Sequence, residues 1–435
     1  MLRLLGAASR RLSASRRGMI AIAGGTALGQ LVGLLGAPVL SRIYSPNDFG
    51  VFAIVLAMVT TIGTVAGSRY ELAIPLPERE SDAYSLVFLG LISCALTAVL
   101  GTLVVALSGN AIAGSFAQEG LRPWLWLVSP TAAIMGAYLV LNQLAIRRLR
   151  YGAIGRRNVL QSSGMTVTQI VLGLAHLRPG GMVLGMAAGQ ALGATSLAFG
   201  SGLRGAAARE GRAPKRAREV ARRYRRFPLL LAPSGLLNVL GMQLPVILLA
   251  YFYGTAVAGW MGLTQRVLAV PVTLVGTAIA QVYLAQLAQS KRSELASAAS
   301  LFGRASRSLL AVGAFVGFVL LVGGPQIFSL VFGQDWETSG KFAQAMSVGL
   351  TAQFIGAPLS QTLIVYERQM LQLTWDIARL LLVTTAIVVC FATRASALTA
   401  VWALSLASAV AYLLSWLLSR RVLRESSALT GASAG

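Results

Sequence analysis

The side chains in this chain that could act on a ligand are arginines placed inside long apolar stretches. Arg266 is the clearest, because twenty-four uncharged residues follow it and Gln265 precedes it. A guanidinium group binds phosphate through two parallel hydrogen bonds, and an arginine within a membrane span normally faces a bundle interior or an aqueous cavity. Arg266, with Gln265 and Gln281, is therefore a candidate contact for an anionic ligand. The alternatives are a structural ion pair or a side chain that reaches to the membrane surface.

Two other arginines lie at the ends of predicted spans. Arg42 ends the first span on the outer side, where it either receives an anionic group or forms an ordinary helix-end charge paired with Asp48. Arg69 follows the second span on the inner side, close to Glu71. These two residues either pair with each other or line the cytoplasmic mouth of a cavity.

Asp376 and Arg379 are three residues apart in a predicted span, so they share one helix face. A buried ion pair is the simpler interpretation. The other is that Asp376 binds a coupling ion, H⁺ or Na⁺. With one histidine and two cysteines in the chain, both cysteines inside predicted spans, we expect no metal site, no disulfide framework and no cofactor.

Composition sets the class of protein that must position these residues. The 435 residues are 56% hydrophobic and only 12% charged, and a soluble protein of this length could not bury so much apolar surface. About twelve apolar segments are long enough, at about 1.5 Å per residue, to cross a hydrocarbon core of roughly 30 Å. We predict an all-α polytopic membrane protein with spans at residues 18–40, 49–68, 84–107, 123–146, 158–177, 180–203, 228–251, 255–284, 309–332, 342–366, 370–393 and 396–418.

The basic residues predict the orientation. If the spans alternate from an inside N-terminus, 30 of the 37 Lys and Arg residues lie inside, five outside and two within spans. The positive-inside rule then places both termini in the cytoplasm, in a bacterial inner membrane. The net charge of +23 is mainly an orientation signal, so we expect no nucleic-acid partner. Residues 1–18 form a basic cytoplasmic flank, with a transit peptide as the alternative.

A basic linker divides the chain into two halves of six spans. We predict an N-terminal lobe at residues 1–203, a cytoplasmic linker at 204–227 and a C-terminal lobe at 228–435. The end of the linker could form a basic helix on the anionic inner leaflet. The halves echo each other, since Tyr44 and Tyr253 each precede a glycine by six residues after a Pro-Val pair. Repeated halves are typical of transporters, with the substrate site at the repeat interface.

Several segments are more specific than their hydrophobicity. They are Pro38-Val-Leu-Ser-Arg-Ile-Tyr-Ser-Pro-Asn-Asp-Phe-Gly-Val-Phe52, Ser68-Arg-Tyr-Glu-Leu-Ala-Ile-Pro-Leu-Pro77, Tyr224-Arg-Arg-Phe-Pro228, Gln265-Arg-Val-Leu-Ala-Val-Pro271 and Leu330-Val-Phe-Gly-Gln-Asp-Trp336. With these segments, the chain resembles the polysaccharide-repeat flippases of the Wzx type, in the multidrug/oligosaccharidyl-lipid/polysaccharide exporter superfamily. The resemblance extends from about Met19 to Arg421.

The resemblance implies two six-helix lobes around a central cavity. It also implies translocation of undecaprenyl-pyrophosphate-linked oligosaccharides from the cytoplasmic to the periplasmic leaflet, for O-antigen, capsule or exopolysaccharide synthesis. The expected partners are the lipid-linked substrate, membrane lipid and, functionally, a polysaccharide polymerase and glycosyltransferases. Peptidoglycan-precursor flippases usually carry two more helices than this chain can hold.

Other functions remain open from the sequence. A drug or metabolite antiporter of the same superfamily is the main alternative, although an exporter of organic cations would more naturally carry acids within the first six spans, which this sequence lacks. A membrane polymerase or ligase usually needs a large periplasmic loop, and a non-transporting scaffold is also possible. We predict no enzymatic activity. The sequence has no Walker motif, and the sugar composition, repeat length, energy source and oligomeric state do not follow from it.

Overall fold

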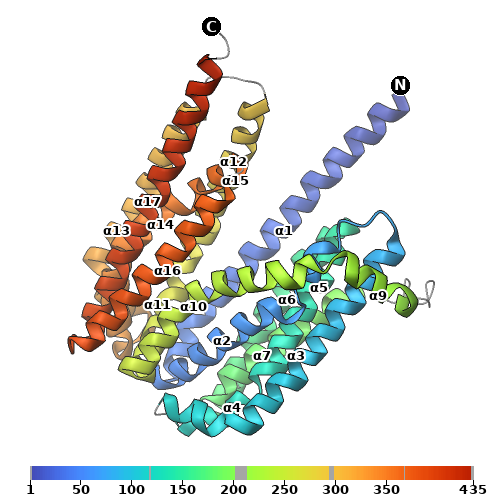
Figure 1. Ribbon diagram of the computed structural model, residues 1–435. Coiled ribbons are helices and arrows are strands. Elements are labelled where there is room, and N and C mark those ends of the chain that lie inside the picture. Colours follow the sequence, from blue (N-terminus) through green and yellow to red (C-terminus); the bar gives the residue numbers. More distant parts are fainter. Residues whose placement is uncertain (1, 117–118, 201–212, 293–297, 367, 433–435) are drawn as a thin grey trace. The chain divides into compact units, whose positions relative to one another are not determined.

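The structure is a computed structural model and describes residues 2–116, 119–200, 213–292, 298–366 and 368–432. Within these ranges the chain is almost entirely helical and contains no strand, which confirms the predicted all-α class (Figure 1). The chain forms two compact units, unit 1 (Met1–Gln243) and unit 2 (Leu244–Gly435). The division falls inside one helix, α10 (Ala232–Tyr253).

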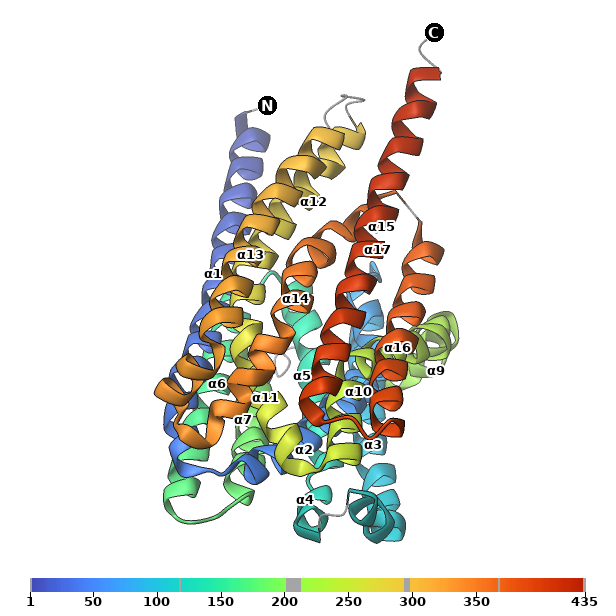
Figure 2. The same ribbon diagram turned by 90° about the vertical axis from the view of Figure 1, so that its left-hand side faces the viewer.

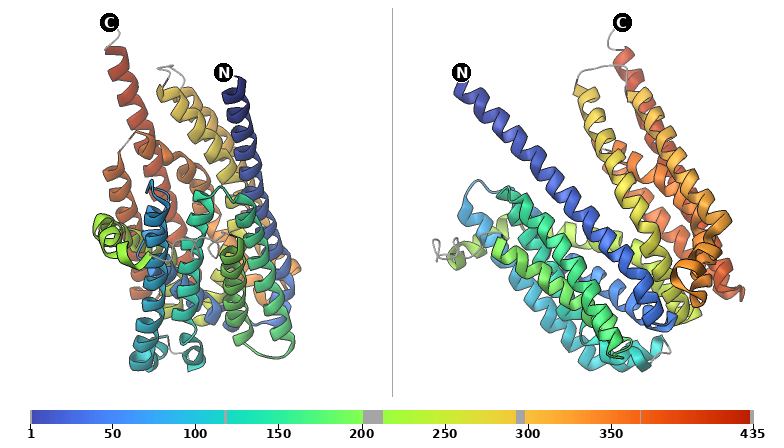
Figure 3. Two further views of the ribbon diagram at one scale, coloured as in Figure 1. Left: turned by 90° about the vertical axis from the view of Figure 1, so that its right-hand side faces the viewer. Right: turned by 180° about the vertical axis from the view of Figure 1, so that it is seen from behind.

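Unit 1 consists of long helices joined by short helical turns. In chain order they are α1 (Leu2–Ile43), α2 (Pro46–Ala66), η1 (Tyr70–Ala73), α3 (Glu80–Ser115), η2 (Glu119–Leu121), α4 (Arg122–Leu125), α5 (Val128–Arg147), α6 (Tyr151–Leu174), α7 (Gly180–Gly200), α9 (Ala213–Arg223), η3 (Phe227–Leu231) and the first part of α10. The N-terminal part of α1 extends beyond the other helices of the unit (Figure 3).

Unit 2 repeats the pattern of long helices with short breaks. After α10 it contains α11 (Thr255–Pro271), η4 (Val272–Gly276), α12 (Thr277–Arg292), α13 (Ala298–Phe332), η5 (Gln334–Trp336), α14 (Glu337–Leu359), α15 (Gln361–Val365), α16 (Gln369–Ala392) and α17 (Ala397–Ala432). α14 packs against both α13 and α17 and lies between them (Figure 2).

Ten of the described helices are long and apolar enough to cross a membrane, so the chain is a multi-pass membrane protein. Of the twelve predicted spans, the two that fall short of this criterion correspond to α6 and α14. Each packs against two neighbouring helices, α6 between α1 and α7, and α14 between α13 and α17. A helix that packs on two sides turns only part of its surface toward lipid, which explains why these two carry more polar residues.

Four predicted single spans are interrupted in the structure. Breaks divide α4 from α5, η3 from α10, α11 from α12 and α14 from α15. Proline explains three of them, because Pro233, Pro271 and Pro358 lie at or beside the interruption and proline removes a helical hydrogen bond. The span predicted at residues 255–284 is present as one membrane-length segment, and the structure adds the π-helical turn η4 within it.

The turn between α1 and α2 follows directly from its sequence. Ser45 caps α2, and the Asp48 side chain accepts a hydrogen bond from the Ser45 backbone N–H at 2.8 Å, forming a capping box with Pro46 in the first turn. Tyr44 is buried beside this cap and donates to the carbonyl of Gln169 in α6 at 2.7 Å. Burial raises the Tyr44 pKa to about 12, so the phenol stays a hydrogen-bond donor at neutral pH.

Glycines bring α1 and α6 into direct backbone contact. A Cβ atom on Gly25 would clash with the backbone of Gly155, and one on Gly36 would clash with the side chain of Thr166. Small residues allow this close approach of helices in lipid. Close packing therefore accounts for these two glycines.

Candidate functional site

Arg266 lies near the middle of α11, in unit 2. Thr264, two residues earlier, ties this stretch to α14, because its buried hydroxyl donates to the carbonyl of Ser339 at 2.9 Å. The Arg266 side chain is half-buried, and its Nη1 atom is buried without a hydrogen-bond partner. Within the part of the chain that the structure describes, no hydrogen bond or ion pair engages this guanidinium group. An unpaired buried charge is costly, so the group is available to an anionic ligand.

The helix changes its geometry directly after Arg266. Pro271 cannot donate a backbone hydrogen bond to the carbonyl of Val267, four residues earlier. The five residues of η4 follow in π-helical geometry. Short π-helical segments occur frequently at functional sites, so Arg266 lies next to an irregular segment of backbone.

The two glutamines predicted beside Arg266 are separated in the structure. Gln265 is half-buried on α11, whereas Gln281 is exposed on α12, beyond η4. Among the described residues, neither glutamine forms a hydrogen bond with Arg266. Their role as ligand contacts remains a prediction.

A second charged group in unit 2 lies on α16 and α17. Arg379 is 4.0 Å from Asp376 and donates to the Tyr412 hydroxyl at 3.1 Å. Its guanidinium carbon is 5.1 Å from the centre of the Trp375 ring, and Gln372 donates to Asp376 at 3.3 Å. The two charges are thus in ion-pair range, and each has a further polar partner. A coupling role for Asp376 stays a prediction.

The predicted candidates of unit 1 lie at opposite ends of α2. Arg42 is exposed in the last turn of α1 and donates to the carbonyl of Pro38 at 2.8 Å, as a cation at a helix C-terminus commonly does. Arg69 adopts a left-handed backbone conformation and is 3.7 Å from the almost fully buried Glu71. Burial raises the pKa of Glu71, and the Arg69 charge offsets only part of this effect.

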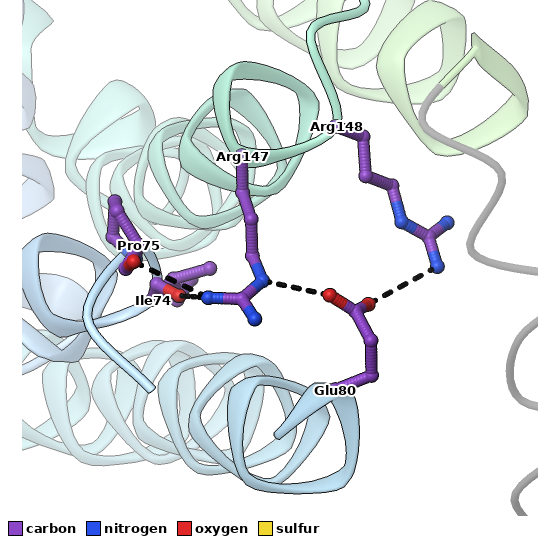
Figure 4. Close-up of polar contacts among 5 residues, drawn as sticks. All are labelled: Ile74, Pro75, Glu80, Arg147 and Arg148. Carbon is purple, nitrogen blue, oxygen red and sulfur yellow. Dashed lines mark hydrogen bonds and ion pairs between the residues drawn. The ribbon is translucent and has the colours of Figure 1, made fainter. Parts of the chain in front are cut away.

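The loop that carries Arg69 and Glu71 is held by α5 (Figure 4). Arg147 donates to the carbonyl oxygens of Ile74 at 3.1 Å and Pro75 at 3.2 Å, and also to the Glu80 carboxylate at 3.0 Å. Arg148 approaches the other Glu80 oxygen at 3.8 Å. Glu80 is in the first turn of α3, where the helix dipole favours a negative charge. One carboxylate therefore joins the ends of α3 and α5.

The basic linker ends in a helix that packs against the same region. Val220 of α9 belongs to a buried cluster with residues of η1, α3 and α5, while Tyr224 and Phe227 pack against this cluster. Arg218 and Arg222 point to the other, exposed side. The predicted basic surface helix is therefore amphipathic and docked on unit 1. Residues 204–212 of the predicted linker lie outside the described residues.

Unit 1 contains a buried arginine that we did not predict from the sequence. Arg157 of α6 is 8% exposed, and its guanidinium carbon lies 3.6 Å from the centre of the Tyr138 ring on α5. Its Nη1 donates to Asn158 at 2.8 Å, and Asn158 donates to Thr26 of α1 at 3.0 Å. Arg157 was counted with the basic flank of a span that we began one residue later. The available signal was the polar spacing of Arg157 and Gln161 on one helix face.

Among the described residues, no group of three or more His, Cys, Asp or Glu side chains could hold a metal ion.

The fold is that of transporters of the MOP superfamily. An inward-facing multidrug-resistance MATE transporter matches with a TM-score of 0.70 at 15% identity, over 92% of this chain and 96% of that one. The lipid II flippase MurJ matches with a TM-score of 0.70 at 12% identity, over 94% and 90%. A MOP-superfamily transporter from Pyrococcus furiosus, described as having a binding pocket of reverse polarity, matches with a TM-score of 0.60 at 17% identity, over 94% and 95%.

The family follows from the sequence. Residues 39–341 match the model of a family described as "Polysaccharide biosynthesis protein". The match covers more than half of the chain, and the chain belongs to this family. No curated protein sequence matches the chain at a significant level.

Proposed function

We propose that this protein is a flippase that moves undecaprenyl-pyrophosphate-linked oligosaccharide repeat units from the cytoplasmic to the periplasmic leaflet by alternating access. The product would serve O-antigen, capsule or exopolysaccharide synthesis. The family supports the pathway, and the fold is one that both flippases and exporters use. The observation that carries the proposal is the unpaired guanidinium of Arg266 within an apolar helix.

The physical problem of flipping explains why such a residue is needed. The reaction breaks no covalent bond, but a pyrophosphate and a polar glycan must cross roughly 30 Å of hydrocarbon. A charged group at the bilayer centre costs several kcal/mol. A fixed cation in a polar cavity lowers this cost, and the lipid tail can remain in the bilayer. Arg266 would bind the pyrophosphate, with Arg42, Arg69, Gln265 and Gln281 as further proposed contacts.

The energy source and partners belong to the same proposal. Asp376 and Arg379 are the proposed coupling residues, with H⁺ or Na⁺ as the ion. Protonation of Asp376 would release Arg379 from the 4.0 Å ion pair. We place the protein in the bacterial inner membrane with both termini in the cytoplasm, acting without a cofactor or enzymatic step. A polysaccharide polymerase and glycosyltransferases would use and supply its substrate.

A second candidate function is export of a drug or metabolite, and the likeness to a multidrug-resistance transporter favours it. A pocket for organic cations would need carboxylates at membrane depth. In the described spans of unit 1, the acidic residues Asp48, Glu80 and Asp82 all lie in first turns of helices. An anionic substrate therefore agrees better with the charges of this chain.

The deciding experiment locates the lipid-linked sugars in a strain that lacks the gene. An impermeant sugar-modifying reagent is applied to right-side-out and inverted membrane vesicles, and undecaprenyl-linked intermediates are extracted. We expect completed repeat units to accumulate on the cytoplasmic face and surface polymer to be lost, with both restored by the wild-type gene. Intact polymer and normal intermediates, in a strain without a second flippase, would instead support the exporter.

A further inference from the structure

Unit 2 has a groove between the start of α13 and the end of α17, with α14 as its floor. Its volume is about 660 Å³, which lies within the range of small-ligand pockets. Figure 2 shows α13 and α17 on either side of α14. The groove lies wholly within one unit, and neither Arg266 nor the Asp376–Arg379 pair lines it.

One part of the groove is apolar and accessible. Leu310 of α13 and Leu413 of α17 are about half exposed, and Ile355 of α14 lies between them. The ring of Trp416 packs against that of Phe302, with centroids 5.9 Å apart. These side chains form a surface that an acyl chain can cover.

The other part is cationic. Arg307, Arg420 and Arg424 line it with exposed side chains, and none of the residues that line the groove is acidic. The Arg420 guanidinium carbon lies 5.3 Å from the centre of the Trp416 ring. The Trp416 indole in turn donates to the Ser306 hydroxyl at 3.0 Å, which joins α17 to α13 across the groove. The cationic side is therefore held in place by a hydrogen bond and a cation–π contact.

The two parts of the groove can be compared with the boundaries of the predicted spans of α13 and α17. The predicted span of α13 begins at residue 309 and that of α17 ends at residue 418, so Arg307, Arg420 and Arg424 fall just outside the predicted spans, and Leu310 and Leu413 fall inside them. Basic pockets between membrane helices bind anionic head groups. We propose that this groove binds an anionic phospholipid from the leaflet facing the basic ends of α13 and α17. This site is separate from the proposed transport function.

The test uses the purified full-length protein in nanodiscs of phosphatidylcholine, with phosphatidylglycerol or cardiolipin titrated in and bound lipid counted by native mass spectrometry. Arg420→Gln and Arg424→Gln should each weaken binding of the anionic lipid about fivefold, and the double variant more. Arg421→Gln is the matched control, because Arg421 is adjacent, is 77% exposed and pairs with Glu425 at 2.8 Å outside the groove. It should bind as the wild type does.

Three results would overturn the proposal. One is wild-type binding of anionic lipid by a triple variant that also carries Arg307→Gln. Another is retention of phosphatidylcholine by the purified protein to the same extent as the anionic lipid. The third is displacement of the lipid by micromolar farnesyl pyrophosphate in the wild type but not in the Arg420→Gln variant, which would assign the groove to isoprenyl pyrophosphates. Melting temperatures of all variants, measured in detergent, separate loss of binding from loss of folding.

Discussion

Arg157 and Arg266 are both arginines with buried side-chain atoms on long helices, but their surroundings differ. Arg157 of unit 1 stacks on Tyr138 at 3.6 Å and donates to Asn158 at 2.8 Å. Arg266 of unit 2 has neither an aromatic nor a polar contact among the described residues, and its Nη1 is buried. The guanidinium group of Arg157 makes contacts within the protein, whereas that of Arg266 makes none among the described residues.

This difference separates a structural cation from a binding cation. A buried charge costs several kcal/mol unless it is paired, so a protein keeps an unpaired one only where a ligand or water supplies the missing contacts. Arg157 joins α6 to α5 and, through Asn158 and Thr26, to α1. Mutation should therefore affect stability at Arg157 and transport at Arg266.

The largest effect on transport is expected for Arg266→Ala. Loss of charged hydrogen bonds to a phosphate costs about 1.5–3 kcal/mol, which corresponds to a fall in substrate affinity of about tenfold or more. Surface polymer should fall accordingly in complemented cells, while the melting temperature of the purified protein should not fall, because the variant removes an unpaired buried charge. Arg266→Lys should restore part of the export, because it keeps the charge without the planar pair of donors.

For the wild type and the Arg266 variants, surface polymer and the amount of the protein in the membrane are measured in the same cells. Wild-type export by a stably inserted Arg266→Ala protein would exclude an essential cationic role at this position. A large loss of melting temperature would instead place Arg266 in the same structural class as Arg157, and the comparison between the two residues would fail.

Arg157→Met is expected to reduce stability. The cation–π contact contributes about 0.5–2 kcal/mol and the charged hydrogen bond about 1.5–3 kcal/mol, so we expect a loss of about 2–5 kcal/mol in the free energy of unfolding. Thermal unfolding in detergent gives the measurement. Arg156→Met is the matched control, since Arg156 is exposed on the same helix. If the two variants melt at the same temperature, the stack on Tyr138 has no measurable effect on stability.

The sequence predicted the helical class and most spans because apolar length and charge asymmetry are local signals. It could not predict the break at η4, since a proline within an apolar stretch can bend, interrupt or merely end a helix. It identified Arg266 because this residue stands alone among apolar residues. It missed Arg157 because Arg156 and Arg150 lie nearby, and a basic cluster resembles a cytoplasmic flank.

Contacts between distant segments account for the rest of what the sequence could not predict. Arg157 is identified as buried only by Tyr138 and Thr26, which lie on two other helices. The loop containing Glu71 depends in the same way on Arg147, more than seventy residues later. Contacts between residues so far apart in the sequence cannot be predicted from the local spacing of residue types.

A smaller effect should distinguish Arg147 from Arg148, which are adjacent and share Glu80 (Figure 4). Arg147→Ala removes two hydrogen bonds to backbone carbonyls as well as a close ion pair, and we expect it to cost about 1.5–3 kcal/mol. Arg148→Ala removes a 3.8 Å ion pair to a half-exposed carboxylate and a 5.1 Å cation–π contact with Tyr84, each expected to contribute at most about 1 kcal/mol. Urea or thermal unfolding of both variants tests the order. Equal losses would mean that Glu80, rather than the Ile74 and Pro75 carbonyls, determines the stability of this loop.

The smallest effect concerns Glu71 and depends on pH. Burial raises the pKa of its carboxyl group above the ordinary 4.5, so folding favours the protonated form. Between the unfolded and the folded pKa, the folded state binds more protons. Stability from this group is therefore present at low pH and declines as the pH rises through that window, by about 1.4 kcal/mol for each unit of pKa shift. Glu71→Gln cannot titrate, so the melting temperature of the wild type relative to this variant should fall from about pH 4.5 upward. A relative melting temperature that rises with pH would mean that the Arg69 charge at 3.7 Å outweighs burial, and Glu71 would then be a stabilising ion-pair partner.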